Sequence, residues 1–467
     1  MNSLILRSAI VAALGGLLFG FDTAVISGAE SQLRLLFDLN DKSYGFTVAI
    51  ALIGTIFGAA LVERPADRLG RRVTLFILAI LYFVSAVGSA FPWDWYSFLG
   101  FRFIGGLAVG GASVVSPMYI AEISPARLRG RLVACAQLNI VLGILLAFLS
   151  NYAIVILCAK YGGEDDAWRW MFGVEAIPSA AFGLLLFLTP ESPRWLVSQQ
   201  RLAEARDVLM RLGTDTELDD TAANELAANE LTVDEEIRRI GQSLAQSRGE
   251  QASRLFERRY MKPILLAIVI AVFNQLSGIN AILYYAPTLF KSAGASPELA
   301  MFQPVIVGAV NLLFTILAMA VIDRFGRRNL MLVGSIGYIV SLSAVAAAFF
   351  VWKEPFPEVG SWCVLGAVLV FIASHAVGQG AVIWVFVSEI FPNQIRAKGV
   401  ALGGMSLWVA NAVVAGVFPE AVKRYGMEWI FTGFAVLMAV QLLWVIFMMP
   451  ETRGVRLEDM EETVKQA

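Results

Sequence analysis

Cysteine, histidine and charge are all scarce in this chain of 467 residues. It has 3 cysteines and 1 histidine, and only 16% of its residues are charged. Three dispersed cysteines cannot form a disulfide framework or a metal site, and we interpret them as small buried side chains. An enzyme embedded in a membrane would need a nucleophile, a metal cluster or a cofactor motif, and the sequence provides none. We therefore expect no enzymatic activity, no metal and no cofactor.

The charge of the chain argues against a nucleic-acid-binding protein. The formal net charge is −2, and the basic residues are dispersed in short clusters, so we expect no nucleic-acid partner. Apolar residues are abundant instead: 58% of the residues are hydrophobic, 31 are Phe and 11 are Trp, and the mean hydropathy is +0.68. An average soluble domain is far less apolar. The composition predicts a chain that resides in a lipid bilayer.

Twelve apolar runs are long enough to cross about 30 Å of hydrocarbon as helices. The first six lie at residues 8–28, 45–63, 73–91, 97–119, 131–155 and 170–189. The second six lie at residues 261–287, 300–322, 330–351, 361–387, 399–419 and 428–449. The first run is longer than the apolar core of a secretory signal and has no cleavage site, so we expect it to be retained. The predicted fold class is an all-α membrane protein with twelve transmembrane helices.

Polar signatures recur in the same order in the two sets of runs. Asp-Arg-x-Gly-Arg-Arg at 67–72 returns at 323–328, Glu-Ile-x-Pro at 122–125 returns at 389–392, and Pro-Glu-Ser/Thr at 190–192 returns at 450–452. Parallel repeats that enclose a central site are common in transporters, so we infer an internal duplication. The expected parts are a six-helix half at 1–189, a linker at 190–260, a second half at 261–449 and a tail at 450–467.

The connections that carry these signatures are rich in arginine, and all fall on one side of the predicted bundle. The positive-inside rule assigns that side and both termini to the cytoplasm, and the acidic connection at 164–166 falls opposite. Ion pairs between the two halves would hold the cytoplasmic side shut and release it in each cycle. The alternative is that the arginines only fix the orientation. This predicted gate consists of Asp67, Arg71, Arg72, Glu122, Arg129, Glu191, Arg327, Arg328, Glu389, Arg396 and Glu451.

The linker has its own helical pattern. Leu202, Val208, Leu209 and Leu212 fit one helical face that ends before a glycine, and a capping box begins at Thr232. We expect two or three short amphipathic helices on the cytoplasmic surface. A disordered linker is the alternative, because residues 218–230 have no periodicity.

Three charged residues lie inside apolar runs. A carboxylate in hydrocarbon costs several kcal/mol, so Asp22 must be paired, protonated or in a wet cavity. Asp22, Arg102 and Glu175 fall at similar depth, the first two within about 10 Å of the outer face. Such a cluster can act as a proton switch, in which Asp22 binds a proton when it separates from Arg102. The alternative is a static ion pair between helices.

Uncharged amides gather in the middle of the seventh run. Asn274, Gln275 and Asn280 bracket Gly278, where a helix can break. Amides and aromatic faces suit a neutral polyhydroxylated ligand. The further candidates for such a site are Gln137, Asn311, Trp384, Trp408 and Asn411. Each amide alone could equally be an interhelical hydrogen bond, and each Trp a packing residue. We interpret His375 as a packing histidine, with a proton role as the alternative.

At these residues the chain resembles the sugar porter family of the major facilitator superfamily over nearly its full length. The resemblance is carried by the strings at 22–28, 190–195, 275–280 and 450–454 and by the paired Asp-Arg-x-Gly-Arg-Arg loops. Within the family the chain is most similar to the bacterial proton-coupled symporters for xylose and related sugars, which have an Asp where Asp22 stands.

The resemblance implies functions for particular residues. It implies proton coupling at Asp22 with Arg102, and sugar contacts at Gln137, Gln275, Asn280, Tyr284, Asn311, Trp384 and Trp408. Asn274 stands where the family usually has a glutamine, and Leu407 and Ile144 stand where xylose symporters have amides. The expected pocket is therefore less polar than theirs. Glu63-Arg64-Pro65 also replaces a small glycine-containing segment before the first signature loop.

The leading prediction is symport of a proton and a monosaccharide, either pentose or hexose, into a cell by alternating access. The alternatives are a uniporter without proton coupling and a membrane sugar sensor that does not transport, which would need a soluble signalling extension. The sequence has no Asn-x-Ser/Thr sequon, which favours a bacterial inner membrane. We expect the chain to act as a monomer.

Overall fold

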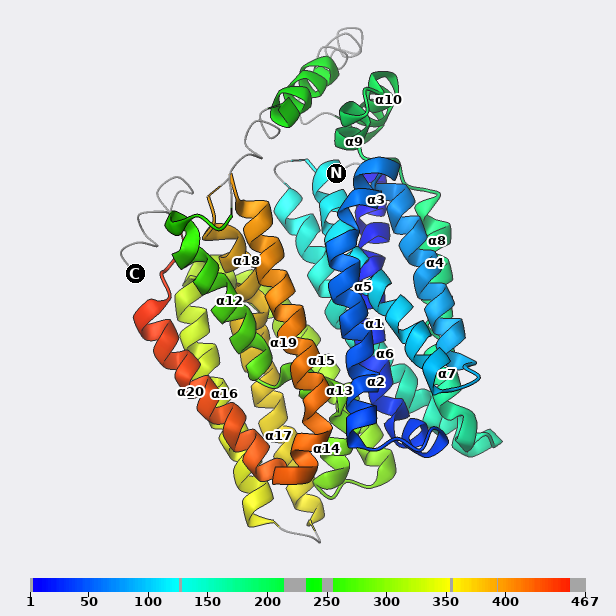
Figure 1. Cartoon of the computed structure of the whole chain (residues 1–467), viewed down its shortest axis with the longest axis vertical. Helices are drawn as coiled ribbons and strands as arrows, with labels where there is room; N and C mark the ends of the chain where they lie inside the picture. The colour runs from blue at the N-terminus through cyan, green and yellow to red at the C-terminus, as the bar shows by residue number, and fades with distance from the viewer. Residues whose placement is uncertain are drawn as a thin grey trace.

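The computed structural model describes residues 3–125, 128–213, 232–245, 255–352, 356–392 and 394–453. Every regular element in these ranges is a helix, as the sequence predicts. The helices form two groups that stand side by side, the first in blue to teal and the second in green to red (Figure 1). Predictions for residues 218–230 and for the tail beyond 453 fall outside the described residues.

The first group contains the elements of the N-terminal half. They are α1(Ser3–Leu36), α2(Asp41–Leu61), α3(Glu63–Leu69), α4(Arg71–Ala90), α5(Trp95–Ile123), α6(Arg129–Tyr161), η1(Glu164–Asp166), α7(Ala167–Gly173) and α8(Ala176–Leu186). We call the end of the bundle where α4 begins the arginine-rich end, and the end where α2 begins the far end.

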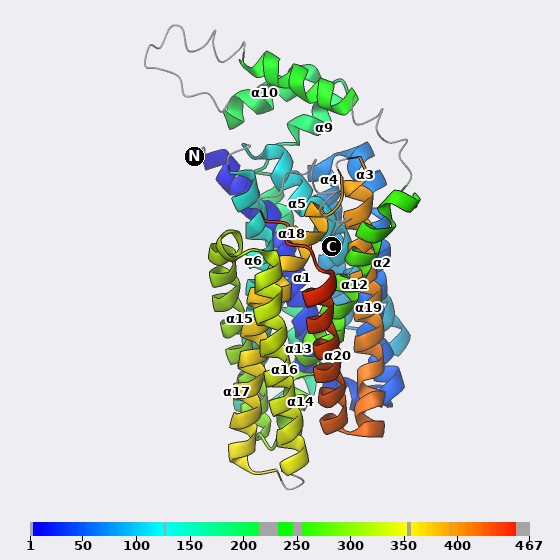
Figure 2. The same cartoon turned by 90° about the vertical axis from the view of Figure 1, so that its left-hand side faces the viewer.

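The second group repeats this arrangement. Its elements are η2(Arg258–Tyr260), α12(Met261–Leu276), α13(Ile279–Tyr284), α14(Ala286–Ser292), α15(Pro297–Phe325), α16(Arg327–Val351), α17(Glu358–His375), η3(Ala376–Gly380), α18(Ala381–Glu389), α19(Arg396–Tyr425) and α20(Met427–Met448). Figure 2 shows these helices running parallel to those of the first group.

Eleven helices of the described residues are long and apolar enough to cross a membrane, one fewer than the twelve apolar runs. The difference is the run at 170–189, which is broken between α7 and α8. Pro178 explains the break, because it has no N–H to donate to the carbonyl of Val174, four residues earlier. That carbonyl accepts instead from Ile177 N at 3.1 Å. The break leaves Glu175 at the junction.

The run at 261–287 is also broken, at the glycine predicted from the sequence. Gly278 has φ of +83°, a conformation that L side chains rarely adopt, and it separates α12 from α13. A Cβ atom there would lie 2.6 Å from the ring of Phe434. Both backbone geometry and packing therefore require glycine at this position.

The linker forms helices at the arginine-rich end. They are α9(Pro193–Ser198), α10(Leu202–Leu212) and a helix at 232–245. α9 and α10 lie beyond the end of the bundle at which α1 begins (Figures 1 and 2). Of the predicted face of α10, Val208 and Leu212 are buried, but Leu202 is exposed; the helix ends at Leu212, before Gly213 with φ of +79°. The predicted helices at 202–212 and after Thr232 are confirmed.

Candidate functional site

A buried ion pair joins α1 to α5 within the first half. Asp22 is 4% exposed and Arg102 is 2% exposed. Nη1 of Arg102 donates to Oδ1 of Asp22, and Nη2 donates to Oδ2 and to the backbone oxygen at 3.3 Å each. The guanidinium also lies 5.4 Å from the ring centroid of Phe172. Pairing cancels the charge that each group would otherwise carry into hydrocarbon.

A second carboxylate lies beside this pair. Glu175, at the break between α7 and α8, is 2% exposed and interacts electrostatically with Asp22 and Arg102. Its Oε1 atom is buried without a hydrogen-bond partner. Two carboxylates and one guanidinium carry a net charge of −1 when all are ionised, and one bound proton makes the cluster neutral. The structure thus brings together the three charged residues that were grouped from the sequence.

The ion pair forms part of the wall of a small cavity between the two halves. Asp22, Arg102 and Phe19 line it from the first half, and Tyr284 and Trp408 line it from the second. Its volume of about 20 Å³ holds about one water molecule. A monosaccharide would fit only if the walls separated. Phe19 and Trp408 meet across the boundary with ring centroids 5.3 Å apart.

The amides at the break in the seventh run form a chain of hydrogen bonds. Asn280 Nδ2 donates to Gln275 Oε1, and Gln275 Nε2 donates to Asn274 Oδ1, both at 2.8 Å. Nearby, Asn411 Nδ2 on α19 donates to the Tyr284 hydroxyl at 3.3 Å, which leaves Asn411 Oδ1 buried without a partner. These amides therefore hold one another in place, and Asn411 Oδ1 remains available to accept a hydrogen bond.

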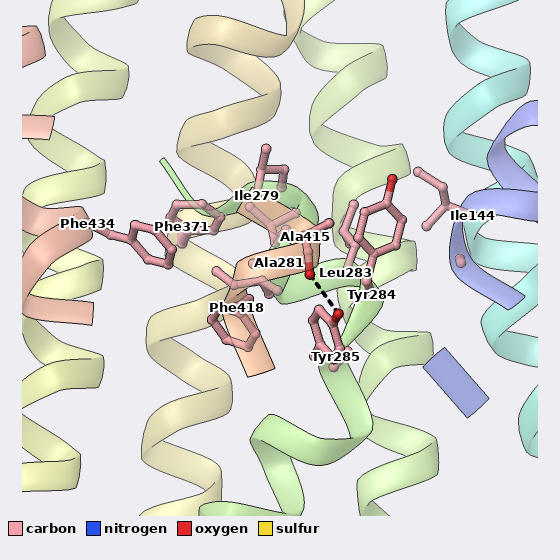
Figure 3. Packing of buried hydrophobic residues seen from close by; sticks show 14 of the residues in the cluster. Ile144, Ile279, Ala281, Leu283, Tyr284, Tyr285, Phe371, Ala415, Phe418 and Phe434 are labelled. Atoms are coloured by element: carbon pink, nitrogen blue, oxygen red, sulfur yellow. Dashed lines mark hydrogen bonds between the residues drawn. The ribbon is translucent and has the colours of Figure 1, made fainter. Parts of the chain in front are cut away.

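Tyr284 and its neighbour Tyr285 point in different directions from α13. Figure 3 shows Tyr284 on the side nearer Ile144 of α6, whereas Tyr285 turns toward Ala415 and Phe418. The Tyr285 hydroxyl donates to the Ala415 carbonyl at 2.8 Å, and its ring stacks on Phe418. Tyr284 is the one of the two that reaches the cavity.

Three other predicted sugar contacts lie on three further helices, α6, α15 and α18. Gln137 on α6 is half-buried, and Asn311 on α15 is buried. Trp384 on α18 is 39% exposed, and its indole lies close to Gly404 of α19. His375 pairs with the hydroxyl of Tyr338 through Nδ1 at 2.7 Å.

The arginine-rich end holds the same cluster of side chains twice. In the first half, Arg71 Nε pairs with Glu122 Oε2 at 2.9 Å, and the Ser192 hydroxyl donates to the same carboxylate at 2.5 Å. In the second half, Arg327 Nη2 pairs with Glu389 at 2.9 Å, and Thr452 donates to Glu389 at 2.5 Å. The duplication inferred from sequence therefore extends to individual side-chain contacts.

Two further carboxylates cap helices at this end. Glu191 accepts from the backbone N–H of Arg71 and Arg72 at 2.9 and 3.1 Å. Burial raises the pKa of Glu191, and hydrogen bonds from backbone N–H groups oppose that shift. Glu451 accepts from the N–H groups of Arg327 and Arg328 in the same way, at 2.9 and 3.1 Å.

In this conformation the described ion pairs at the arginine-rich end lie within a half. The pairs of Arg71 with Asp67 and Glu122, and of Arg327 with Glu389, each join residues of one half, so the gate between the halves stays a prediction for a state in which this end is shut. In each half, the arginine and the carboxylate that form a pair lie on different segments, and those segments pack against each other. Arg396 Nε donates to the Phe391 carbonyl at 3.3 Å, also within its half. The side chain of Arg129 lies outside the described residues.

Direct polar contacts between the halves occur at the far end. Thr288 donates to Glu30 Oε2 at 2.5 Å, and Lys423 pairs with Asp41 at 3.0 Å. Arg34 joins the two carboxylates, at 3.0 Å from Glu30 and 2.9 Å from Asp41. Glu30 was missed from the sequence because the first helix was predicted to end at residue 28, whereas α1 continues to Leu36.

The backbones of the two halves also touch at the far end. A Cβ atom on Gly45 of α2 would lie 2.0 Å from the carbonyl oxygen of Gly416 on α19. Tyr44 and Tyr285 meet edge to face with ring centroids 6.0 Å apart. In this conformation the far end is closed by contacts between the halves.

Comparisons with known proteins agree with this architecture. The family model described as "Sugar (and other) transporter" matches residues 8–464. The D-xylose-proton symporter of Escherichia coli (strain K12) is 37% identical over 98% of this chain and 96% of that protein. The arabinose-proton symporter of Bacillus subtilis (strain 168) is 34% identical over 97% of this chain and 93% of that protein.

Solved structures show the same fold. The inward-open xylose transporter of E. coli superposes with a TM-score of 0.82 at 34% identity, covering 98% of this chain and 99% of that one. The proton:xylose symporter bound to 6-bromo-6-deoxy-D-glucose superposes with a TM-score of 0.77 at 35% identity, covering 98% and 99%.

Proposed function

The chain belongs to the sugar transporter family, and from that premise we propose that it carries a monosaccharide into the cell together with a proton. A transporter of this family is not an enzyme, in agreement with the composition. The observation that supports the proposal most directly is the shared cavity. Asp22 and Arg102 from one half face Tyr284 and Trp408 from the other across that cavity. A proton on Asp22 can therefore be coupled to movement of the halves.

The proton step follows from the charges in the cluster. When Asp22 is ionised it holds Arg102, and protonation of Asp22 removes that attraction. Arg102 then has the carboxylate of Glu175 as its remaining anionic neighbour. The positive charge thus keeps a counter-ion in both protonation states, so neither state leaves an unpaired guanidinium in hydrocarbon.

The sugar step uses groups from both halves. Asn274, Gln275, Asn280, Tyr284 and Asn411 provide amides and a hydroxyl that can exchange their mutual hydrogen bonds for those of sugar hydroxyls. We assign Gln137, Asn311, Trp384 and Trp408 to the same site. Opening of the cavity at the arginine-rich end would admit or release the sugar while the far end stays closed, as alternating access requires.

The two ends have different parts in this cycle. The arginine clusters brace each half internally, since their described pairs stay within a half. We assign the arginine-rich end to the cytoplasm by the positive-inside rule, in a bacterial inner membrane, with the chain acting as a monomer. One proton moving down 100 mV provides about 2.3 kcal/mol, enough to concentrate a sugar about 50-fold.

Uptake into proteoliposomes with and without an inward proton gradient tests the proposal. D-xylose, L-arabinose, D-glucose and D-galactose are compared for the wild type, Asp22→Asn and the control Asp38→Asn, which alters an exposed carboxylate outside the cavity. We expect the gradient to drive accumulation in the wild type and the control, and Asp22→Asn only to equilibrate sugar. A wild type that ignores the gradient would be a uniporter, and one that moves no sugar would refute the proposal entirely.

A further inference from the structure

The tenth membrane segment contains an irregular turn directly before a predicted sugar contact. α17 ends at His375, residues Ala376–Gly380 form a π-helical turn, and α18 carries Trp384. Turns of this kind are rare and occur mostly at functional sites. The function proposed above assigns no role to the turn or to the polar side chains around it.

The turn determines the direction in which Trp384 points. A π turn accommodates one residue more than an α turn, and each residue of an α-helix advances the side-chain direction by about 100°. Every residue of α18 is therefore rotated by roughly that angle relative to an uninterrupted helix. With the turn present, Trp384 lies against α19, where a Cβ on Gly404 would be 3.8 Å from the indole. Without the turn, the indole would leave this contact.

Buried side chains anchor the turn to two neighbouring helices. Gln379, within the turn, donates through Nε2 to Gln441 Oε1 on α20. Gln441 Nε2 donates to the Ser335 hydroxyl on α16 at 2.9 Å. Gln379 Oε1 accepts from the Tyr338 hydroxyl at 3.4 Å. All four side chains are fully buried.

His375 completes the network at the start of the turn. Its Nδ1 lies 2.7 Å from the Tyr338 hydroxyl. The hydroxyl has a single proton, so it can donate to Gln379 only when His375 carries its own proton on Nδ1 and donates to the hydroxyl. In either tautomer His375 contacts Tyr338 at the start of the turn.

The backbone of the turn also presses on α16. A Cβ on Gly378 would lie 3.0 Å from the Cα of Gly334, and the reverse contact is the same. Two glycines thus let the widened turn fit against the neighbouring helix. The amide network then holds it there, because a released amide would be left unpaired in an apolar interior.

We propose that Gln379, Gln441 and Tyr338 are positioning residues that hold the π turn and thereby aim Trp384 at the sugar. This inference rests on the proposed function, which places Trp384 in the sugar site. It assigns the specificity of the site partly to residues on α16 and α20, which do not touch the sugar themselves.

The test removes one amide of the network and compares it with a matched amide elsewhere. Gln441→Leu leaves Gln379 unpaired, and Gln303→Leu is the control, because Gln303 is a buried amide paired with Ser361 at 3.0 Å between α15 and α17. Binding of D-xylose and D-glucose to the purified full chain is measured for each variant, alone and combined with Trp384→Ala. Gln441→Leu should weaken binding about tenfold, and Gln303→Leu less than twofold.

The double variant separates positioning from general damage. If Gln441 acts through Trp384, Gln441→Leu should weaken sugar binding almost no further once Trp384→Ala is present. An equal loss of binding in both backgrounds would overturn the proposal, as would a Gln441→Leu variant that binds like the wild type.

A second readout does not depend on sugar. Trp384→Cys is introduced into a chain whose three cysteines, Cys135, Cys158 and Cys363, are replaced, and the rate of maleimide labelling is followed. Gln441→Leu should change that rate at least threefold and Gln303→Leu should not. An unchanged rate refutes the positioning role. A changed rate in a protein that binds neither sugar supports the positioning role and refutes the proposed function.

Discussion

The Thr288 hydroxyl on α14 donates a hydrogen bond to the Glu30 carboxylate on α1, 2.5 Å away, across the boundary between the two halves. Glu30 is also paired with Arg34, which reaches Asp41, which in turn pairs with Lys423 on α19. The chain of contacts begins and ends in the second half and passes through the first. It can exist only while the far end is closed.

Removal of the Thr288 hydroxyl should therefore favour opening of the far end. We expect Thr288→Val to shift the population toward longer distances between spin labels at the exposed positions Leu35 on α1 and Tyr425 on α19. A hydrogen bond to a charged group contributes about 1.5–3 kcal/mol, which corresponds to a population ratio changed about tenfold or more. Thr432→Val is the control, because that hydroxyl bonds within its own helix. Identical distance distributions for all three proteins would contradict the prediction.

The pair of Lys423 with Asp41 should contribute less. Lys423 is well exposed, and water and salt weaken ion pairs between exposed groups. Lys423→Met should raise the open population of the far end by at most about fivefold, and added salt should reduce the difference from the wild type. Arg424→Met, one residue further along α19, removes an equal charge that lies over Tyr425. A salt-independent effect, or one equal in both variants, would show that this pair does not hold the far end.

Glu175 should lower the thermal stability of the protein and should be needed for proton coupling. Its Oε1 atom is buried without a partner beside a second carboxylate, so ionisation of Glu175 is costly, and Glu175→Gln removes that cost. We expect the variant to unfold at a temperature a few degrees higher, consistent with about 1–3 kcal/mol, and to lose proton-driven accumulation while still exchanging sugar. Thermal unfolding in detergent and the uptake assay measure the two effects. A lower unfolding temperature with normal accumulation would contradict both.

Gly278 offers a test of the break in the seventh segment. Gly278→Ala places a Cβ at a φ of +83° and 2.6 Å from Phe434, which should cost at least about 1–2 kcal/mol. Sugar affinity should also fall, because the break sets the amides of Asn274, Gln275 and Asn280 against one another. Gly433→Ala is the control, because nothing lies within 4 Å of its added Cβ. Equal thermal stability and affinity for the two variants would rule out the break as the cause.

Much of the site follows from sequence because the bilayer makes polar residues conspicuous. Asp22, Arg102 and Glu175 are charges within apolar runs, and the alternation of helix direction places them at one depth. Gly278 predicts a helix break because glycine, which has no Cβ, readily adopts the backbone conformations that end a helix. The structure brings the three charges together and breaks the helix at that glycine.

Other features could not be read from the sequence. The arginine signatures show which side of the bundle they occupy, but which carboxylate each arginine pairs with depends on how the connections fold onto one another. The break before Glu175 depends on Pro178, whose effect falls four residues upstream inside an uninterrupted apolar run. Glu30 became part of the far-end contacts only because α1 extends eight residues beyond the apolar run that ended at 28.

The sequence by itself determined that the chain resides in a bilayer, the number of apolar runs, the duplication and the candidate residues for binding a proton or a sugar. It could do so because hydrocarbon penalises each misplaced polar group locally, wherever the other helices lie. The tertiary structure decided which end is closed, which half each ion pair belongs to, and where the indole of Trp384 points. Those properties depend on contacts between segments more than a hundred residues apart and on the rotation that one π-helical turn gives to α18. No local sequence pattern specifies either.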